Sequence, residues 1–221
     1  MFQTVIFDLD GTLLDTSEDL TAAGNHVCRE NGWPEYEVSE FMSLVGHGIP
    51  NLVSRFSPPD AQSPERLAES LRQFSAWYGA HSMDKTHPYP GIENMLSRLR
   101  ADGVQMAVYS NKADDFSKAL IEHFFPGCFA LIQGKRDGIP VKPDPTGLRV
   151  ILDQLQADPG KTLFAGDSSV DIRTGQNAGI KTCGVSWGFR SRASLEEAGA
   201  DHIADRAEDL ESIIRQFHFH N

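Results

Sequence analysis

The sequence has few cysteines, no excess of basic residues and no long apolar run. Three cysteines occur among 221 residues and none forms a C-x-x-C pair, which argues against a disulfide framework or a cysteine-ligated zinc site. Lysine and arginine number 20 against 31 aspartates and glutamates, a formal charge of −11, so no nucleic-acid partner is expected. No apolar stretch approaches the roughly 20 residues that a membrane-spanning helix needs.

The first residues lack the basic start of a signal peptide, because the chain runs directly into an apolar segment. Together with the cysteine usage, this predicts a cytoplasmic protein without a membrane partner. Hydrophobic residues make up 40% and charged residues 23%, as in an ordinary globular fold. An acidic protein that binds an anion needs a local positive site, and a metal ion is one way to supply it.

Short apolar segments alternate with helical patterns along most of the chain. The apolar residues are nearly continuous within each segment, as in parallel strands that are covered on both faces. Helical spacing is clearest over Ile92–Leu99 and Leu148–Leu155. We therefore predict a Rossmann-like, doubly wound α/β core. Its expected strands are residues 4–7, 104–109, 129–132, 162–165, 182–185 and, more weakly, 202–204.

The stretch between the first two expected strands is too long for one crossover helix. Helices can begin at Thr16-Ser17 and at Ser63-Pro64, and a helical pattern over Glu40–Phe56 is broken by Gly46-His47-Gly48. The proline-rich segment Asp84–Gly91 follows as a return linker. An all-helical insert in this position can act as a lid, or cap, over the strand ends. The expected domains are a core of residues 1–15 and 83–221 and a helical cap of residues 16–82.

Two aspartates follow the first expected strand in the sequence VIFDLDGT. Asp8 and Asp10 are two residues apart, so on an extended chain they face the same side and repel each other unless a cation or a proton lies between them. Ligands of parallel sheets bind at the carboxyl ends of the strands. Later segments bring further polar side chains to that edge, namely Ser110, Asn111, Lys112, Lys142, Asp167, Ser168 and Asp171.

These residue types suit a magnesium site. Proteins hold Mg²⁺ with one or two carboxylates and with phosphate oxygens of the ligand, and a cation between Asp8 and Asp167 relieves the repulsion. A carboxylate beside Mg²⁺, the Ser110 hydroxyl and the Lys142 ammonium are suited to phosphoryl transfer through an aspartyl-phosphate. Asp10 can then exchange a proton with the leaving oxygen.

Four segments resemble the motifs of haloacid dehalogenase superfamily phosphatases. They are DLDGTLLDT, the pair SN, a lysine before PDP, and GDSSVD, and they occur in this order over nearly the whole chain. The insert is similar to the cap of that superfamily. The resemblance implies a nucleophile (Asp8), a general acid/base (Asp10), phosphate binding by Ser110 and Lys142, substrate contacts at Gly11 and Asn111, and Mg²⁺ held by Asp8, the Asp10 carbonyl, Asp167 and Asp171.

Differences from other branches of the superfamily narrow the expected reaction. Dehalogenases lack the second aspartate, which is present here as Asp10. Phosphonatases use a cap lysine, yet the first lysine of this chain is Lys85, and β-phosphoglucomutases place a histidine where this chain has Leu20. A receiver domain also uses aspartate, serine or threonine, and lysine on a parallel sheet, but it needs neither the insert nor Asp10.

Two segments resemble phosphoglycolate phosphatases. VGHGIPNLVSR (Val45–Arg55) is similar to their cap loop, and VSWGFR (Val185–Arg190) to the stretch after their fifth strand. We therefore predict a Mg²⁺-dependent phosphatase of a small phosphorylated metabolite, with 2-phosphoglycolate as the best candidate, acting as a monomer or homodimer. The alternatives are a phosphatase of another small ester or of pyrophosphate, and a non-catalytic phosphate-binding protein of the same fold.

Several of these residues also have ordinary structural interpretations. Asn111 can close a turn, Lys112 can be solvated and Asp171 can cap a helix. His47, between two glycines, is either a substrate contact or a plain turn residue, and Arg55 is either a cap anion site or a surface charge. The two histidines of the terminal FHFHN invite a metal interpretation, but we expect a frayed tail there.

Overall fold

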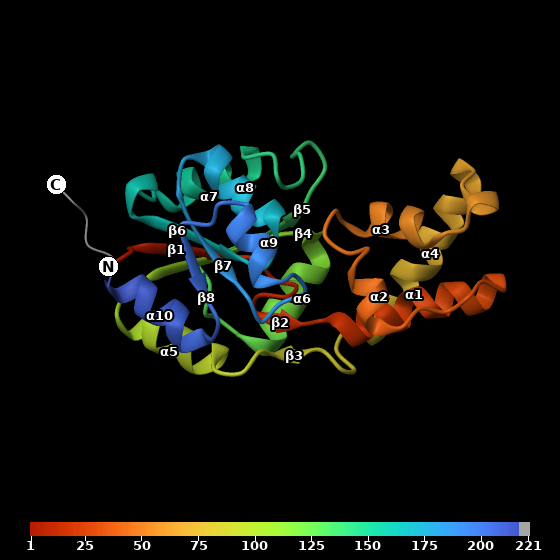
Figure 1. Cartoon of the computed structure of the whole chain (residues 1–221), viewed down its shortest axis with the longest axis horizontal. Coiled ribbons are helices and arrows are strands. Elements are labelled where there is room, and N and C mark those ends of the chain that lie inside the picture. Colours follow the sequence, from red (N-terminus) through yellow and green to blue (C-terminus); the bar gives the residue numbers. More distant parts are fainter. Residues whose placement is uncertain (217–221) are drawn as a thin grey trace. The chain divides into compact units, whose positions relative to one another are not determined.

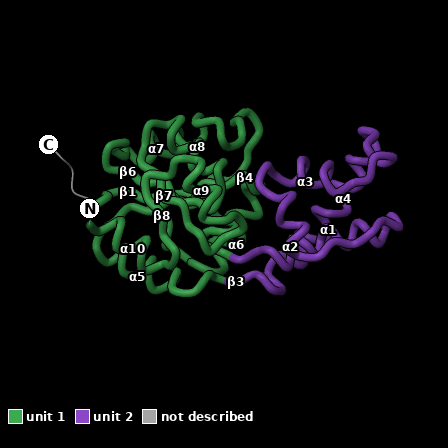
Figure 2. Tube along the Cα trace, viewed as in Figure 1, with its two compact units in different colours: residues 1–14, 88–221 green, residues 15–87 purple. Residues whose placement is uncertain are grey.

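The structure, a computed structural model, describes residues 1–216 and divides the chain into two compact units. Unit 1 is Met1–Leu14 with Pro88–Asn221, and unit 2 is Asp15–His87 (Figure 2). The terminal FHFHN lies outside the described residues. Within residues 1–216, no helix combines the length and apolar character needed to cross a membrane.

Unit 1 is built around a six-stranded sheet with the order β5-β4-β1-β6-β7-β8 (Figure 1). All neighbouring strands are parallel, and Phe7 at the end of β1 pairs with Val108 on one side and Ala165 on the other. The chain continues from β1 toward one edge and from β6 toward the opposite edge, so the topological switch point lies between these two strands. The strands are β1 (Thr4–Phe7), β4 (Gln105–Ala113), β5 (Leu131–Lys135), β6 (Thr162–Gly166), β7 (Lys181–Val185) and β8 (His202–Ala204).

Helices cover both faces of this sheet. Helices α5 and α10 pack together on one face, and α7 and α8 pack together on the other (Figure 1). The apolar side of α7 lies on Tyr109 of β4 and Phe164 of β6, the two strands that flank β1, in one buried cluster with Leu148 and Ile151. The predicted doubly wound α/β core is confirmed. Its helices are α5 (Ile92–Ala101), α6 (Asp114–Phe124), α7 (Thr146–Leu155), α8 (Ser169–Ala178), α9 (Arg192–Glu197) and α10 (Ala207–Gln216), with a 3-10 turn η2 (Pro159–Lys161).

Strand β4 is longer than predicted. It continues through Ser110, Asn111 and Lys112 to Ala113, and its pairing with β5 becomes irregular between Tyr109 and Ala113. The polar residues expected just beyond the strand are therefore held in extended backbone. This fixes the direction of each side chain more tightly than a free loop would.

Unit 2 is helical, as predicted. Helices α1 and α4 pack side by side, and a row of neighbouring aromatic rings (Phe41, Phe56, Phe74 and Tyr78) fills its interior. The predicted start of α4 is confirmed, because the Ser63 side chain accepts a hydrogen bond from the Arg66 amide. The elements are α1 (Ser17–Asn31), α2 (Val38–Met42), α3 (Ile49–Phe56), α4 (Pro64–His81) and a 3-10 turn η1 (Pro59–Ala61).

The boundary of unit 2 extends beyond the predicted residues 16–82, to 15–87. The buried Asp19 carboxylate on α1 accepts hydrogen bonds from the Lys85 amide and from the amide and hydroxyl of Thr86, which ties half of the expected linker to the helices. The chain passes between the units in two short strands that pair with each other, β2 (Leu14–Asp15) and β3 (His87–Pro88). The sequence pattern predicts no strand in this region, so these two strands are a difference from the expected all-helical insert.

Candidate active site

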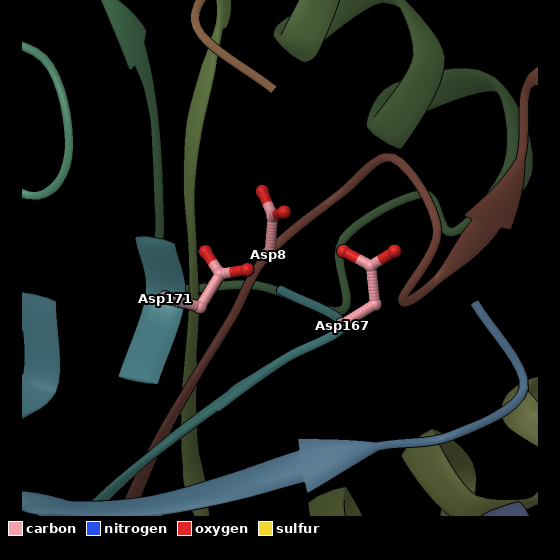
Figure 3. A group of neighbouring side chains, drawn as sticks. All are labelled: Asp8, Asp167 and Asp171. Atoms are coloured by element: carbon pink, nitrogen blue, oxygen red, sulfur yellow. The ribbon is translucent and has the colours of Figure 1, made fainter. Parts of the chain in front are cut away.

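Three aspartates meet at the switch point of the sheet. Asp8 follows β1, Asp167 follows β6, and Asp171 lies in the first turn of α8, with their carboxyl groups close together (Figure 3). One oxygen from each carboxylate lies within 4.8 Å of the others, and all three residues are buried. Three carboxylates from two segments of the chain, the end of β1 and the β6–α8 junction, thus share one small space at the place where ligands of such sheets bind.

Lys142 supplies positive charge to this cluster. Its Nζ lies 2.8 Å from Asp8 Oδ1 and 2.6 Å from Asp171 Oδ1, and it also donates to the Tyr109 carbonyl at 3.3 Å. The rings of Tyr109 and Phe164 lie 5.7 and 5.5 Å from the ammonium, within the range of cation–π attraction. The lysine is therefore fixed by two carboxylates, one carbonyl and two aromatic rings.

Asp171 caps α8, one of the two interpretations that the sequence left open, and it also pairs with Lys142. Its Oδ2 accepts from the amide and the hydroxyl of Ser168, which caps the start of α8, while its Oδ1 pairs with Lys142. Both oxygens are thus already engaged. Asp8 and Asp167 retain more capacity for a direct ligand.

Burial raises the pKa values of Asp8 and Asp167. Burial raises the pKa of Asp8 from 3.8 to about 7 against the opposing effect of Lys142, with further increases from Asp171 and Asp10. Burial, with Asp171 and Asp8 beside it, also raises the pKa of Asp167 well above its usual range. Burial alone would lower the pKa of Lys142, but Asp171 and Asp8 outweigh it and raise that pKa. The protein by itself resists placing so many negative charges together.

The charge and donor set fit a divalent metal ion. Full ionisation of the three carboxylates, against one ammonium, would leave two negative charges for a bound cation to compensate in this buried space. All three potential ligands are carboxylate oxygens, the type that Mg²⁺ prefers over the nitrogen and sulfur ligands of softer metals. Asp8 and Asp167 are the residues best placed to hold such an ion.

Asp10 lies outside this carboxylate cluster. The sequence predicted that Asp8 and Asp10 face the same side of an extended chain. Strand β1 ends at Phe7, before both residues, and Asp10 lies close enough to raise the pKa of Asp8 but pairs with a different lysine. Lys112 Nζ lies 2.9 and 3.2 Å from the two Asp10 oxygens. Lys112 is therefore not the solvated residue that we considered.

Ser110 and Asn111 are both buried near Lys142. The Ser110 hydroxyl accepts from the Lys112 amide at 3.2 Å, and its own proton is not used in that bond. The Asn111 side chain accepts from the Lys142 amide at 2.8 Å and donates to the Lys142 carbonyl at 3.2 Å. Asn111 thus clamps the backbone that carries Lys142.

Segment Ser186–Phe189, which follows β7, also contacts Asp167. The Phe189 amide donates to Asp167 Oδ2 at 2.7 Å, and the Trp187 indole donates to the Thr12 carbonyl at 3.0 Å. A Cβ added at Gly188 would lie 2.2 Å from the Gly11 carbonyl oxygen and 2.4 Å from Asp167 Cβ. Gly188 is needed for this approach.

Gly11 packs closely against both Asp167 and Gly188. It has a φ of +81°, and a Cβ there would lie 2.3 Å from Asp167 Oδ2. The sequence indicated Gly11 as a substrate contact, and the structure places it directly against a candidate metal ligand. The backbone of the turn after β1 therefore packs on Asp167 where no side chain would fit.

The two candidate residues of unit 2 have local surroundings. His47 is exposed between Gly46 and Gly48, both of which have positive φ. Arg55 is exposed on α3, and its guanidinium donates to the Leu44 carbonyl at 3.0 Å. Both belong to the segment 44–55, which folds back on itself within unit 2.

Sequence reasoning missed several contributors to the site. It did not identify Tyr109 and Phe164 beneath Lys142, nor the Phe189 amide on Asp167. A glycine three residues after an expected strand, Gly188, was the available signal for a close backbone approach. The Phe189 contact had no signal, because any residue except proline supplies the same amide.

Comparison with known proteins agrees with this architecture. The sequence profile of the haloacid dehalogenase-like hydrolases matches residues 5–185. A phosphoglycolate phosphatase of Aquifex aeolicus is 30% identical, and a pyrophosphatase PpaX of Bacillus mycoides is 31% identical, with 96% of each chain covered in both comparisons. A solved structure from Lactobacillus delbrueckii subsp. bulgaricus superimposes with a TM-score of 0.91 at 34% identity, covering 96% of this chain and 98% of the other.

Proposed function

This chain belongs to the haloacid dehalogenase-like hydrolases, and from that premise we propose a Mg²⁺-dependent phosphatase that hydrolyses a small phosphate monoester through an aspartyl-phosphate. One observation carries the proposal: the buried cluster of Asp8, Asp167 and Asp171, with Lys142 in its midst, at the switch point of the sheet. The cluster combines a carboxylate nucleophile, a place for a divalent cation and a fixed ammonium.

In the proposed reaction, Asp8 attacks phosphorus and the bond to the leaving oxygen breaks. Asp10 gives its proton to the leaving oxygen, and later takes one from the water that attacks the aspartyl-phosphate. Lys142 holds Asp8 in position, and the Ser110 hydroxyl binds a phosphate oxygen. The second step releases inorganic phosphate and restores Asp8.

Asp8, the Asp10 carbonyl and Asp167 would hold the metal, with Asp171 assisting through Lys142 and α8. When bound, Mg²⁺ neutralises charge on the transferring phosphoryl group and orients it for in-line attack. Gly11 and the Phe189 amide keep Asp167 in the orientation that this requires.

For the substrate, we propose 2-phosphoglycolate, a small carboxylated ester. The phosphoglycolate phosphatase of Aquifex aeolicus supports this choice. Pyrophosphate is the second candidate, because a relative named as a pyrophosphatase is similar to the same degree. In either case His47 and Arg55 are proposed to contact the end of the substrate that does not react. A cytoplasmic location and a monomeric or homodimeric state are further parts of the proposal.

The test is a kinetic screen of purified protein with MgCl₂. We expect hydrolysis of a panel of phosphate monoesters, with the highest kcat/KM for 2-phosphoglycolate, and complete loss after chelation that Mg²⁺ restores. A kcat/KM for pyrophosphate above that for every ester would select the second candidate. Absence of hydrolysis of every panel member after Mg²⁺ repletion would refute the phosphatase proposal.

A further inference from the structure

Lys112 is a buried cation for which the proposed reaction has no use. Its side chain is 2% exposed, against 15% for that of Asp10, its partner in an ion pair of 2.9 Å. A buried ion pair contributes little to stability on average, because desolvation offsets the attraction. Asp10 lies two residues after the nucleophile Asp8, and Lys112 lies two residues after Ser110. This position suggests that the pair has a function in the reaction.

The backbone around Lys112 is held from several sides. It lies on β4 where pairing with β5 is irregular, its amide donates to Ser110 Oγ at 3.2 Å, and its carbonyl accepts from Ser117 Oγ at 3.4 Å. These contacts fix where the side chain begins, and burial limits its conformers. The ammonium is therefore held in one position, where it donates to both Asp10 oxygens.

We propose that Lys112 is a positioning residue that aims the Asp10 carboxyl group at the leaving oxygen, and that it thereby adapts the enzyme to alkyl phosphate esters. The inference rests on the proposed function. An alkoxide is a strongly basic leaving group that needs a proton as its bond to phosphorus breaks, whereas a nitrophenolate leaves readily without one. The orientation of Asp10 therefore matters for alkyl esters and much less for activated aryl esters.

The proposed step balances as follows. A lone pair of Asp8 forms the new bond to phosphorus, the electron pair of the breaking bond stays on the leaving oxygen, and the Asp10 proton moves to that oxygen. The products are an alcohol, the phosphorylated Asp8 and an Asp10 carboxylate, which then forms the ion pair with Lys112. Lys112 itself neither gains nor loses a proton.

The two lysines of the site should consequently differ in what they affect. Lys142 contacts Asp8 and Asp171, so its loss should impair the attack on every ester. Lys112 contacts the acid/base residue, so its loss should impair only the esters that need a proton donor. This difference separates a positioning function from a merely structural one.

The experiment compares kcat/KM for 2-phosphoglycolate and for p-nitrophenyl phosphate in Lys112→Met. For each ester, kcat/KM reports the steps up to release of the leaving group. We expect a loss of about 10²-fold for the alkyl ester and less than about 5-fold for the aryl ester. Asp10→Asn should show the same selectivity, and the double variant should be no worse than Asp10→Asn alone, since both act on one proton transfer.

Lys181→Met is the matched control, because Lys181 also pairs with an aspartate of unit 1, Asp201, but at the surface. This variant should leave kcat/KM unchanged for both esters. Lys112→Arg keeps the charge and should recover part of the loss on the alkyl ester. If Lys112→Met does not fold, as judged by circular dichroism, Lys112→Arg carries the same comparison with a smaller selective loss.

Equal losses on both esters in the folded variant would overturn the inference and leave the proposed phosphatase intact. Unchanged kcat/KM for the alkyl ester would overturn it as well. Wild-type protein that hydrolyses neither ester would refute the proposed function, and this inference with it.

Discussion

The candidate site of unit 1 and the candidate contacts of unit 2 are built in opposite ways. In unit 1, Asp8 and Lys142 are buried and are held together across more than a hundred residues of chain. In unit 2, His47 and Arg55 are exposed, and Arg55 contacts a carbonyl only 11 residues away. A buried site held by long-range contacts tolerates few changes, whereas an exposed loop can vary with the substrate. We therefore expect changes in unit 1 to affect the chemical step and changes in unit 2 to affect substrate preference.

The largest effect is expected from Asp8→Asn. The amide cannot attack phosphorus, so kcat should fall by on the order of 10⁴-fold or more on every ester. The fold should persist, because the substitution removes a negative charge from a crowded cluster, and the Tm of metal-free protein should not fall. Asp153→Asn, on the exposed side of α7, is the control and should behave as wild type. Substantial activity in Asp8→Asn would contradict the assignment of the nucleophile.

The sequence predicted which side chains of unit 1 come together, because their residue types carry the chemistry. Asp8, Asp167 and Lys142 follow strands of one parallel sheet, and parallel strands deliver their carboxyl ends to one edge. The Lys112–Asp10 pair was not predicted, because its partners are 102 residues apart and a strand that extends through Lys112 looks like a loop start in sequence. The boundary of unit 2 was missed for a similar reason, since Asp19 holds a linker 66 residues away.

Gly188→Ala should give the next largest effect. The added Cβ would displace Gly11, Asp167 or both, and the Phe189 amide would lose its alignment on Asp167. Partners of metal ligands typically contribute about 10- to 100-fold in metal affinity, and we expect a loss of that size in Mg²⁺ affinity measured by calorimetry.

Gly160→Ala is the matched control for this change. Gly160 is exposed, and a Cβ there meets only the end of the Asp158 side chain at 3.3 Å. Its Mg²⁺ affinity should equal that of wild type. Equal affinities in Gly188→Ala and Gly160→Ala would mean that segment 186–189 does not position Asp167.

The stabilisation by Mg²⁺ should depend on pH. Burial, opposed by Lys142, raises the folded-state pKa of Asp8 from 3.8 to about 7, so metal-free folded protein binds more protons than unfolded protein in this interval. The contribution of this group to stability is therefore present below about pH 4 and is lost as the pH rises through about 7. Mg²⁺ competes with these protons, so the increase in Tm on adding MgCl₂ should be larger at pH 8 than at pH 5. A larger increase at pH 5 would contradict this explanation.

The smallest effect is expected from Arg55→Met in unit 2. Its guanidinium is exposed, so the Tm should change little, and no group of the unit 1 site is altered. If Arg55 binds the carboxylate of 2-phosphoglycolate, KM for this substrate should rise by about tenfold, the order expected for one charge-assisted contact, while kcat stays near its wild-type value. Phosphate esters without a carboxylate should show no such increase.

Arg66→Met is the control, because Arg66 is an exposed arginine of unit 2 that likewise donates to a backbone carbonyl, that of Asp60. The same increase in both variants would indicate a general loss of positive charge rather than a specific contact at Arg55.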